Sequence, residues 1–177
     1  YSLVRNLLVS MASPRVSIII PSLDRPDSLA RCLESLGYQS FSNFEVIVLK
    51  EKGALAKIRN EGAKKAKGEI LTFIDDDVLC PASWLTAVVR AFDQDKERVG
   101  VSGPAVIPTE YRVNRDLFRY KRIKQLYDWL FLGTQCTLPG HITRAGAFTT
   151  GASQEECQYE GEVEFLEACN SAYKREA

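Results

Sequence analysis

The sequence has no excess of charge of either sign and no long apolar run. Lys plus Arg and Asp plus Glu number 23 each among 177 residues, so the formal net charge is zero at neutral pH. Nucleic-acid-binding domains are usually basic, and this balance gives no reason to expect such a partner. No apolar stretch approaches the roughly 20 residues that a membrane-spanning helix needs. We therefore expect neither a nucleic-acid-binding protein nor a transmembrane segment.

Paired cysteine motifs are missing as well. The five cysteines form an odd set without a Cys-x-x-Cys spacing. This pattern argues against a disulfide framework or a zinc site and favours buried thiols in a reducing compartment. We therefore expect a cytoplasmic protein. His141 is the single histidine and has no second ligand at metal-binding spacing, so we assign it no chemical role.

Apolar, β-branched runs alternate with helical patterns through the first 105 residues. Such near-continuous apolar runs are typical of parallel strands that are buried on both faces. Helices are expected from Pro26, over Leu55–Ala66 with Gly68 as the stop, and from Pro81. This order predicts an α/β fold with a mostly parallel central sheet flanked by helices. The predicted strands are Val16–Ile20, Phe44–Leu49, Ile70–Ile74 and Val99–Pro104.

Polar residues follow three of these predicted strands. In open α/β sheets, ligands bind at the carboxyl ends of the strands. Asp75, Asp76 and Asp77 come directly after the third strand, and an extended chain would point Asp75 and Asp77 one way and Asp76 the other. Carboxylate oxygens suit Mg²⁺ or Mn²⁺, which keep bound water and take phosphate as a further ligand. We therefore predict a divalent-cation site at Asp75 and Asp77 rather than an ordinary solvated run of acids.

Arg59 and Asn60 lie in the predicted helix before the third strand. A lone arginine on a helix is usually a solvated surface residue. Arg59, however, would come near the same crevice, where its guanidinium could pair with a phosphate. Position alone leaves both interpretations open.

Short motifs along the chain resemble the family 2 glycosyltransferases. Val16–Pro21 with Asp24-Arg25 is similar to the family's first strand and its "P-T-Y-N-R" turn. Further matches follow in the family's order over about residues 14–108 and 160–177, and this order makes the resemblance specific. They are Ile58–Gly62 with Ala66–Glu69 ("A-R-N-x-G…A-x-G-E"), Phe73–Val78 with Pro81 and Trp84-Leu85 ("F-L-D-x-D…P-x-W-L"), Gly103-Pro104, and Phe165–Asn170 with Tyr173–Glu176 ("L-x-G-x-N…F-R-R-E").

The resemblance implies the Rossmann-like GT-A fold and a role in carbohydrate biosynthesis. The implied enzyme is an inverting, metal-dependent transferase of the hexosyltransferase type. It would move a sugar from a UDP- or GDP-sugar to a hydroxyl of a saccharide or lipid-linked acceptor. Asp75 and Asp77 would hold Mg²⁺ or Mn²⁺ as a DXD motif. The implied substrate-binding residues are Pro21, Ser22, Leu23, Arg25, Glu51, Arg59, Asn60, Asp75, Asp76 and Asn170.

The sequence departs from the family pattern at informative positions. Lys50–Gly53 stands where the family usually has "D-D-G-S", so Glu51 would have to contact the nucleobase, whose identity stays open. Leu23 replaces a frequent tyrosine, and Ala168 replaces a glycine. The family's general base lies in an acidic motif after the last matched segment, so we expect it beyond Ala177 and assign no catalytic residue.

Three segments and two alternatives complete the prediction. Residues 1–13 are expected to be an amphipathic extension, 14–108 the nucleotide-sugar-binding part, and 109–177 a helix with an acceptor-side region that is incomplete at its C-terminus. Without an initiating Met, the sequence reads as a piece of a longer protein. The basic segment 112–124 suits an ordinary amphipathic helix, which we favour, or a peripheral contact with the cytoplasmic membrane face.

Two alternative functions are a sugar nucleotidyltransferase and a non-catalytic nucleotide- or sugar-binding domain. The first of these needs a Gly-rich loop after the first strand.

Overall fold

The structure is a computed structural model that describes residues 13–103, 139–142, 148–150, 161–163, 166 and 169–176. The predicted N-terminal extension, apart from residue 13, and the basic segment 112–124 lie outside the described residues. The chain divides into two compact units, residues 1–99 with 172–177 and residues 100–171. The segment boundaries predicted from the sequence remain predictions. No helix in the described ranges is long and apolar enough to cross a membrane.

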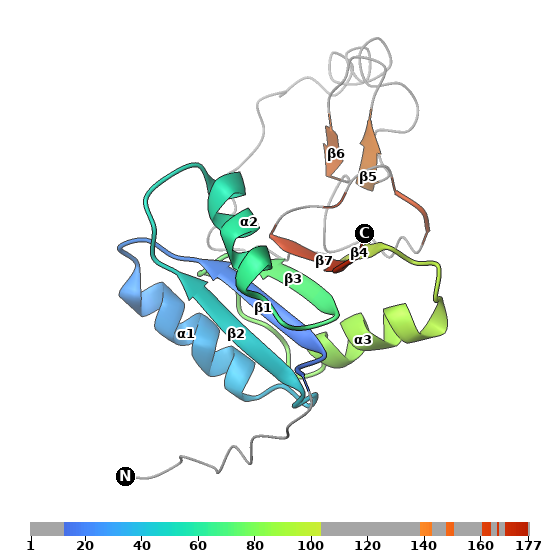
Figure 1. The fold of residues 1–177 in the computed structure, drawn as a ribbon, viewed down its shortest axis with the longest axis horizontal. Coiled ribbons are helices and arrows are strands. Elements are labelled where there is room, and N and C mark those ends of the chain that lie inside the picture. Colours follow the sequence, from blue (N-terminus) through green and yellow to red (C-terminus); the bar gives the residue numbers. More distant parts are fainter. Residues whose placement is uncertain are drawn as a thin grey trace, which may run out of the picture. The chain divides into compact units, whose positions relative to one another are not determined.

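Strands and helices alternate through the first part of the chain (Figure 1). A five-stranded sheet has the order β2-β1-β3-β7-β4, and β5 and β6 form a separate antiparallel pair. The α/β prediction is confirmed. The elements are β1 (Val16–Pro21), α1 (Pro26–Gly37), β2 (Phe44–Leu49), α2 (Leu55–Lys65), β3 (Ile70–Ile74), α3 (Trp84–Gln94), β4 (Gly100–Ser102), β5 (Pro139–Ile142), β6 (Phe148–Thr150) and β7 (Asn170–Lys174).

The central strand β1 runs parallel to both of its neighbours. Val16 lies opposite Phe44 of β2 and Ile70 of β3, and Pro21 at the other end lies opposite Leu49. The carboxyl ends of the three strands therefore meet at one edge of the sheet, where the segments after them come together.

Apolar side chains on both faces of β1 form the core. On one face, Ile19 packs with Leu49, Ile58, Ala66 and Leu71, and this cluster fixes α2 against the sheet. Figure 1 shows α2 over this face and α1 over the other. The buried stripes of α1 and α3 match the predicted helical spacing; they are Leu29, Cys32 and Leu36 in α1 and Leu85, Val88, Val89 and Phe92 in α3.

Strand β2 is less buried than its apolar sequence predicts. Val46 is 36% exposed, and only Leu49 of this strand is buried. The reason is topological, because β2 is the last strand in the sheet order and pairs only with β1.

Two helix boundaries differ from the sequence prediction. α3 begins at Trp84 rather than at Pro81, because the Pro81 carbonyl accepts the Trp84 N–H in a turn before the helix. Gly68 is not the stop of α2, which ends when Ala66 takes an extended conformation. A Cβ at Gly68 would lie 2.7 Å from the backbone nitrogen of Ser17. Gly68 therefore permits a close approach to β1, where its N–H donates to the Ser17 hydroxyl at 2.8 Å.

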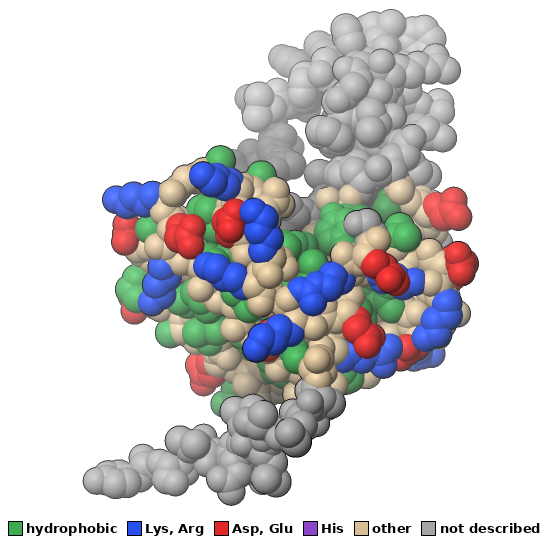
Figure 2. Space-filling model, in the orientation of Figure 1, with side chains coloured by type: hydrophobic (Ala, Val, Ile, Leu, Met, Phe, Trp, Pro, Cys, Tyr) green, Lys and Arg blue, Asp and Glu red, His purple; other side chains and the backbone are tan. Residues whose placement is uncertain are grey.

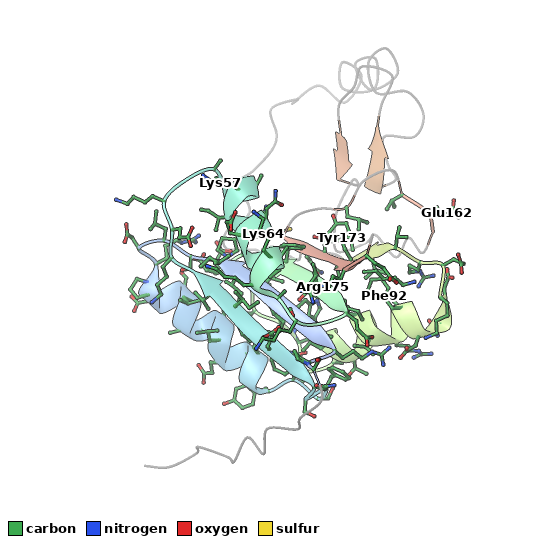
Figure 3. The ribbon with its side chains drawn as sticks, viewed as in Figure 1. Lys57, Lys64, Phe92, Glu162, Tyr173 and Arg175 are labelled. Carbon is green, nitrogen blue, oxygen red and sulfur yellow. The ribbon has the colours of Figure 1, made fainter. Side chains whose placement is uncertain are left out.

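β7 was not predicted as a strand. Lys174 N–H donates to the Val99 carbonyl and Arg175 N–H to the Glu69 carbonyl, so this distant segment is bonded beside β3. Tyr173 packs edge-on against Phe73 of β3, with 6.0 Å between ring centroids (Figure 3). Its residues NSAYK lack the apolar β-branched run that revealed the other strands.

Candidate nucleotide-sugar pocket

A pocket of about 370 Å³ opens at the carboxyl ends of β1 and β3. All of its lining residues belong to the unit of residues 1–99 and 172–177. They come from the turn after β1, the loop after β2, the start of α2 and the turn after β3. The lining residues are Pro21, Ser22, Leu23, Arg25, Glu51, Gly53, Leu55, Ile58, Asp75, Asp76 and Asp77.

The three consecutive carboxylates differ in exposure. The side chains of Asp75, Asp76 and Asp77 are 38%, 4% and 52% exposed. β3 ends at Ile74, and Asp76 and Asp77 lie in a turn, so strand alternation does not govern their directions. The sequence predicted Asp76 to point away from Asp77, and this detail is wrong, because both contact Arg25.

Arg25 bridges Asp76 and Asp77 with two arms of its guanidinium. Nη1 lies 2.8 Å from Asp76 Oδ1, and Nη2 lies 2.7 Å from Asp77 Oδ2. The hydrogen bond to Asp77 and the nearby carboxylates raise the pKa of Arg25 above its already high ordinary value. Asp24, just before it, has a φ of 54°, a left-handed conformation that is uncommon for any residue but glycine.

Arg59 reaches the pocket from α2. Its Nη2 lies 2.7 Å from Asp75 Oδ1, and the Arg59 side chain is only 15% exposed. The open question about this residue is thus answered for its position: Arg59 is not a solvated surface arginine. Its Nε is buried and has no hydrogen-bond partner among the described residues.

An acidic group and two apolar side chains line the side of the pocket away from β3. Glu51 lies 3.5 Å from Lys65 Nζ, and both are more than half exposed. Leu23 and Leu55 are 40% and 46% exposed, which is unusual for leucine in a structured segment. Gly53, in the loop before α2, has a φ of 153°, a conformation that favours glycine.

The turn that carries the carboxylates is attached to the end of α1. Gln39 donates from Nε2 to the Pro81 carbonyl at 2.7 Å and accepts the Leu85 N–H at 3.0 Å. Ser35 Oγ accepts the Cys80 N–H at 3.1 Å, and Ser40 bonds Ala82. These bonds fix the segment after Asp77, so the carboxylate turn is held at both of its ends.

Two buried thiols lie beneath the same turn. The Sγ of Cys32 lies 3.9 Å from the Asp75 carbonyl. Burial, reinforced by the charges of Asp76 and Asp77, raises the Cys32 pKa to about 11. Burial, with a smaller effect of Cys32, raises the Cys80 pKa to about 12. Cys32 and Cys80 are buried as the sequence predicted, whereas Cys169 is only partly buried; the other two cysteines lie outside the described residues.

Most of the residues predicted to bind substrate come together in this pocket. Arg59 joins them through Asp75, whereas Asn60 is exposed and does not line the pocket. Asn170 belongs to the other unit, where its carbonyl accepts the Gly103 N–H and the Ser102 hydroxyl. The sequence analysis did not select Gly53, Leu55 or Ile58, which also line the pocket. Leu55 was a usable signal, because it is an apolar residue at the predicted start of a helix.

The carboxylates suit a divalent cation by their chemistry. Asp75 and Asp77 offer partly exposed oxygen donors, and the Arg25 guanidinium already stands against Asp77 as a cation. No group of three or more His, Cys, Asp or Glu side chains within the described ranges is arranged to hold an ion. Mg²⁺ does not require such a cage, because it often takes one or two carboxylates and completes its shell with water and phosphate.

The fold places the chain among the α/β proteins with the GT-A fold. The model of glycosyl transferase family 2 matches residues 46–151, more than half of the sequence, so the chain belongs to this family. The match confirms the family predicted from the motifs.

Individual relatives agree with this assignment. An uncharacterized glycosyltransferase of Haemophilus influenzae is 36% identical over 35% of this chain and 29% of its own length. The putative glycosyltransferase EpsH of Bacillus subtilis is 27% identical over 50% of this chain and 33% of its own length. The chain thus spans about a third of the length of these relatives.

A solved structure shares the fold. The mannosyltransferase PcManGT from Pyrobaculum calidifontis, in complex with GDP-Man and Mn²⁺, has a TM-score of 0.55 and 16% identity, covering 94% of this chain and 46% of that chain.

Proposed function

We propose that this chain is the donor-binding part of an inverting glycosyltransferase that uses a nucleotide-diphosphate sugar and a divalent cation. The observation that carries the proposal is the Asp75–Asp77 turn, which lies with Arg25 in a pocket at the strand ends of a family 2 domain. The Mn²⁺ and GDP-Man bound by the mannosyltransferase from Pyrobaculum calidifontis support a similar ligand here.

Each group of the pocket has a role in this proposal. Arg25 and Arg59 supply guanidinium groups that pair with phosphate oxygens. Leu23 and Leu55 offer apolar area for a nucleobase, and Glu51 offers an acceptor for a base N–H. Asp75 and Asp77 would hold Mg²⁺ or Mn²⁺, which neutralises the leaving diphosphate when bound. UDP- and GDP-sugars both remain candidates for the donor.

The proposal also extends to the acceptor of the sugar. We expect a saccharide or lipid-linked hydroxyl as the acceptor, which loses its proton to a carboxylate as it attacks with inversion. A cytoplasmic location with peripheral membrane contact also remains a proposal. The family assignment favours sugar transfer over the nucleotidyltransferase alternative.

Calorimetric titration tests the donor site. We expect UDP or GDP to bind in the presence of Mn²⁺ and at least about tenfold more weakly without it, since one metal–phosphate contact is worth more than 1.4 kcal/mol. Asp77→Ala should remove this metal dependence. The control is Asp95→Ala, which removes a carboxylate of similar exposure, 46%, on the far end of α3.

Three results would contradict the proposal in whole or in part. Binding of no nucleotide in any combination would reject the donor site. Metal-stimulated binding that Asp77→Ala leaves unchanged would reject the role of Asp77. Binding by a longer chain that shows no sugar transfer to any acceptor would favour the non-catalytic alternative.

A further inference from the structure

The guanidinium of Arg25 occupies the space between two carboxylates that have very different surroundings. Asp77 is 52% exposed, whereas Asp76 is 4% exposed and keeps its charge out of water. A buried carboxylate needs an opposite charge, because desolvation is costly without one. Arg25 meets this need while half of its own side chain faces solvent. The ion pair of Arg25 with Asp76 is therefore shielded from water, whereas its ion pair with Asp77 is exposed and can exchange for another partner.

The balance of charge around the carboxylates disfavours an additional cation while Arg25 is bound. Asp75, Asp76 and Asp77 carry three negative charges, and Arg25 and Arg59 in contact with them carry two positive ones. A divalent ion added to this set would make it formally positive and would be repelled by the guanidinium against Asp77. If Arg25 left, the same ion would make the set neutral.

The Arg25 side chain can change its partner while the backbone around it stays in place. Arg25 is the N-cap of α1 and makes no side-chain capping bond, so its guanidinium has no second task in the helix. Pro26 follows and has a fixed φ, while the left-handed Asp24 precedes it. Both neighbours thus restrict the backbone conformation around Arg25. Exchange is therefore confined to the side chain.

We propose that Arg25 is a resident counter-ion of Asp76 and Asp77 that opposes divalent-cation binding until a diphosphate draws it away. This inference rests on the proposed function. A diphosphate offers the guanidinium a new bidentate partner, and the cation then supplies the positive charge that Asp76 and Asp77 need in its place. Nucleotide and cation consequently favour each other's binding, and this coupling is equal in both directions.

Titration with Mn²⁺ alone, followed by the electron paramagnetic resonance of the free ion, tests the proposal without any measurement of activity. We expect Arg25→Gln to bind Mn²⁺ about tenfold more tightly than the unsubstituted chain. This is the lower end of the effect that a neighbouring unit charge has on proton binding by a carboxylate. Arg25→Lys keeps the charge and should stay close to the unsubstituted chain. Arg15→Gln breaks a comparable Arg–Asp pair, with Asp93, and is expected to change nothing.

The coupling gives a second measurement. The ratio of UDP or GDP affinity with and without Mn²⁺ should fall in Arg25→Gln. Without the guanidinium, Mn²⁺ binding no longer depends on the diphosphate. Circular dichroism shows whether each variant is folded. Should Arg25→Gln lose its fold, Arg25→Met, which keeps the length of the side chain, serves in the same titration.

The outcomes separate this inference from the proposed function. If the unsubstituted chain binds Mn²⁺ with nucleotide but a folded Arg25→Gln binds Mn²⁺ alone no more tightly, the counter-ion role is overturned and the donor site stands. Equal tightening by Arg15→Gln would also overturn it, since the effect would then be one of net charge. Absence of Mn²⁺ binding in every combination overturns both.

Discussion

The thiols of Cys32 and Cys80 lie beneath the carboxylate turn and are held in their neutral form. Burial raises their pKa values from an ordinary 9.0 to about 11 and about 12. Because the folded pKa values are raised, their contribution to stability is complete below pH 9 and is lost as the pH rises toward 11 and above. The thiolate, which is the reactive form, is therefore scarce at pH 8.

We expect iodoacetamide at pH 8 to modify Cys32 and Cys80 at least about a hundredfold more slowly in the folded chain than in urea, in line with a rise of about two pKa units. Mass spectrometry of peptides after timed quenching measures each site. Cys169, which is only partly buried, serves as an internal comparison. Equal rates for Cys32 with and without urea would contradict the placement of this thiol.

Single residues of the pocket were predictable when a strand led directly into them. Asp75 follows the apolar run of β3, and Arg25 follows the turn after β1, so both could be placed at the sheet edge from sequence. Their partners could not, because an ion pair depends on turn conformation. The left-handed Asp24 and the turn at Asp76 decide that Arg25 meets two carboxylates, and no periodicity encodes this.

The packing of α2 on β1 depends on a glycine. A Cβ at Gly62 would lie 2.5 Å from Ile19 Cγ2 and 2.7 Å from Leu49 Cδ1, so these buried side chains would have to shift. Overpacking of this kind typically costs about 1–3 kcal/mol, and the better helix propensity of alanine returns up to about 1 kcal/mol.

Gly62→Ala is therefore expected to lower the free energy of unfolding by about 1 kcal/mol or more, measured by urea denaturation. Gly37→Ala is the matched control, because nothing lies within 4 Å of a Cβ at this last residue of α1. We expect the control to be neutral or slightly stabilising. A Gly62→Ala chain as stable as the control would show that the helix can move away from the strand without loss.

Elements were predicted well where hydrophobic period and type agreed, as in β1, β3 and α1. Boundaries failed where tertiary contacts decided them. Pro81 resembles a helix start, yet its carbonyl serves Gln39 and Trp84 in the preceding turn. Gly68 resembles a helix stop, yet its purpose is the close contact with Ser17. The contacts with Gln39 and Ser17 are not local in sequence, so they were not visible before the fold.

Over the whole sequence, basic and acidic residues are equal in number. On the face shown in Figure 2, lysine and arginine side chains are interspersed with acidic ones, in keeping with equal numbers of each. Lys57 and Lys64 extend from α2 on this part of the chain (Figure 3). A nucleotide should thus be recognised by the pocket and not by a general basic surface.

Binding should accordingly stabilise the chain through one specific site. With Mn²⁺ present, UDP or GDP at a hundred times its Kd should add about 2.7 kcal/mol. For a chain of this size each kcal/mol corresponds to about 2–4 °C in Tm, which a calorimetric scan resolves. Asp77→Ala is expected to show a much smaller rise. An equal rise in this variant would indicate binding elsewhere on the surface.

The bonds that β7 makes have a consequence for how the chain is assembled. Residues 174 and 175 bond the backbone at Val99 and Glu69, which are synthesised well before them. At about 5–20 residues per second, the edge of β3 is synthesised several seconds before this partner. Sheets that depend on such distant pairings fold slowly, and an unpaired strand edge invites association with other chains. The carboxylate turn therefore follows a strand whose hydrogen bonding is completed only after a long further stretch of chain has been synthesised.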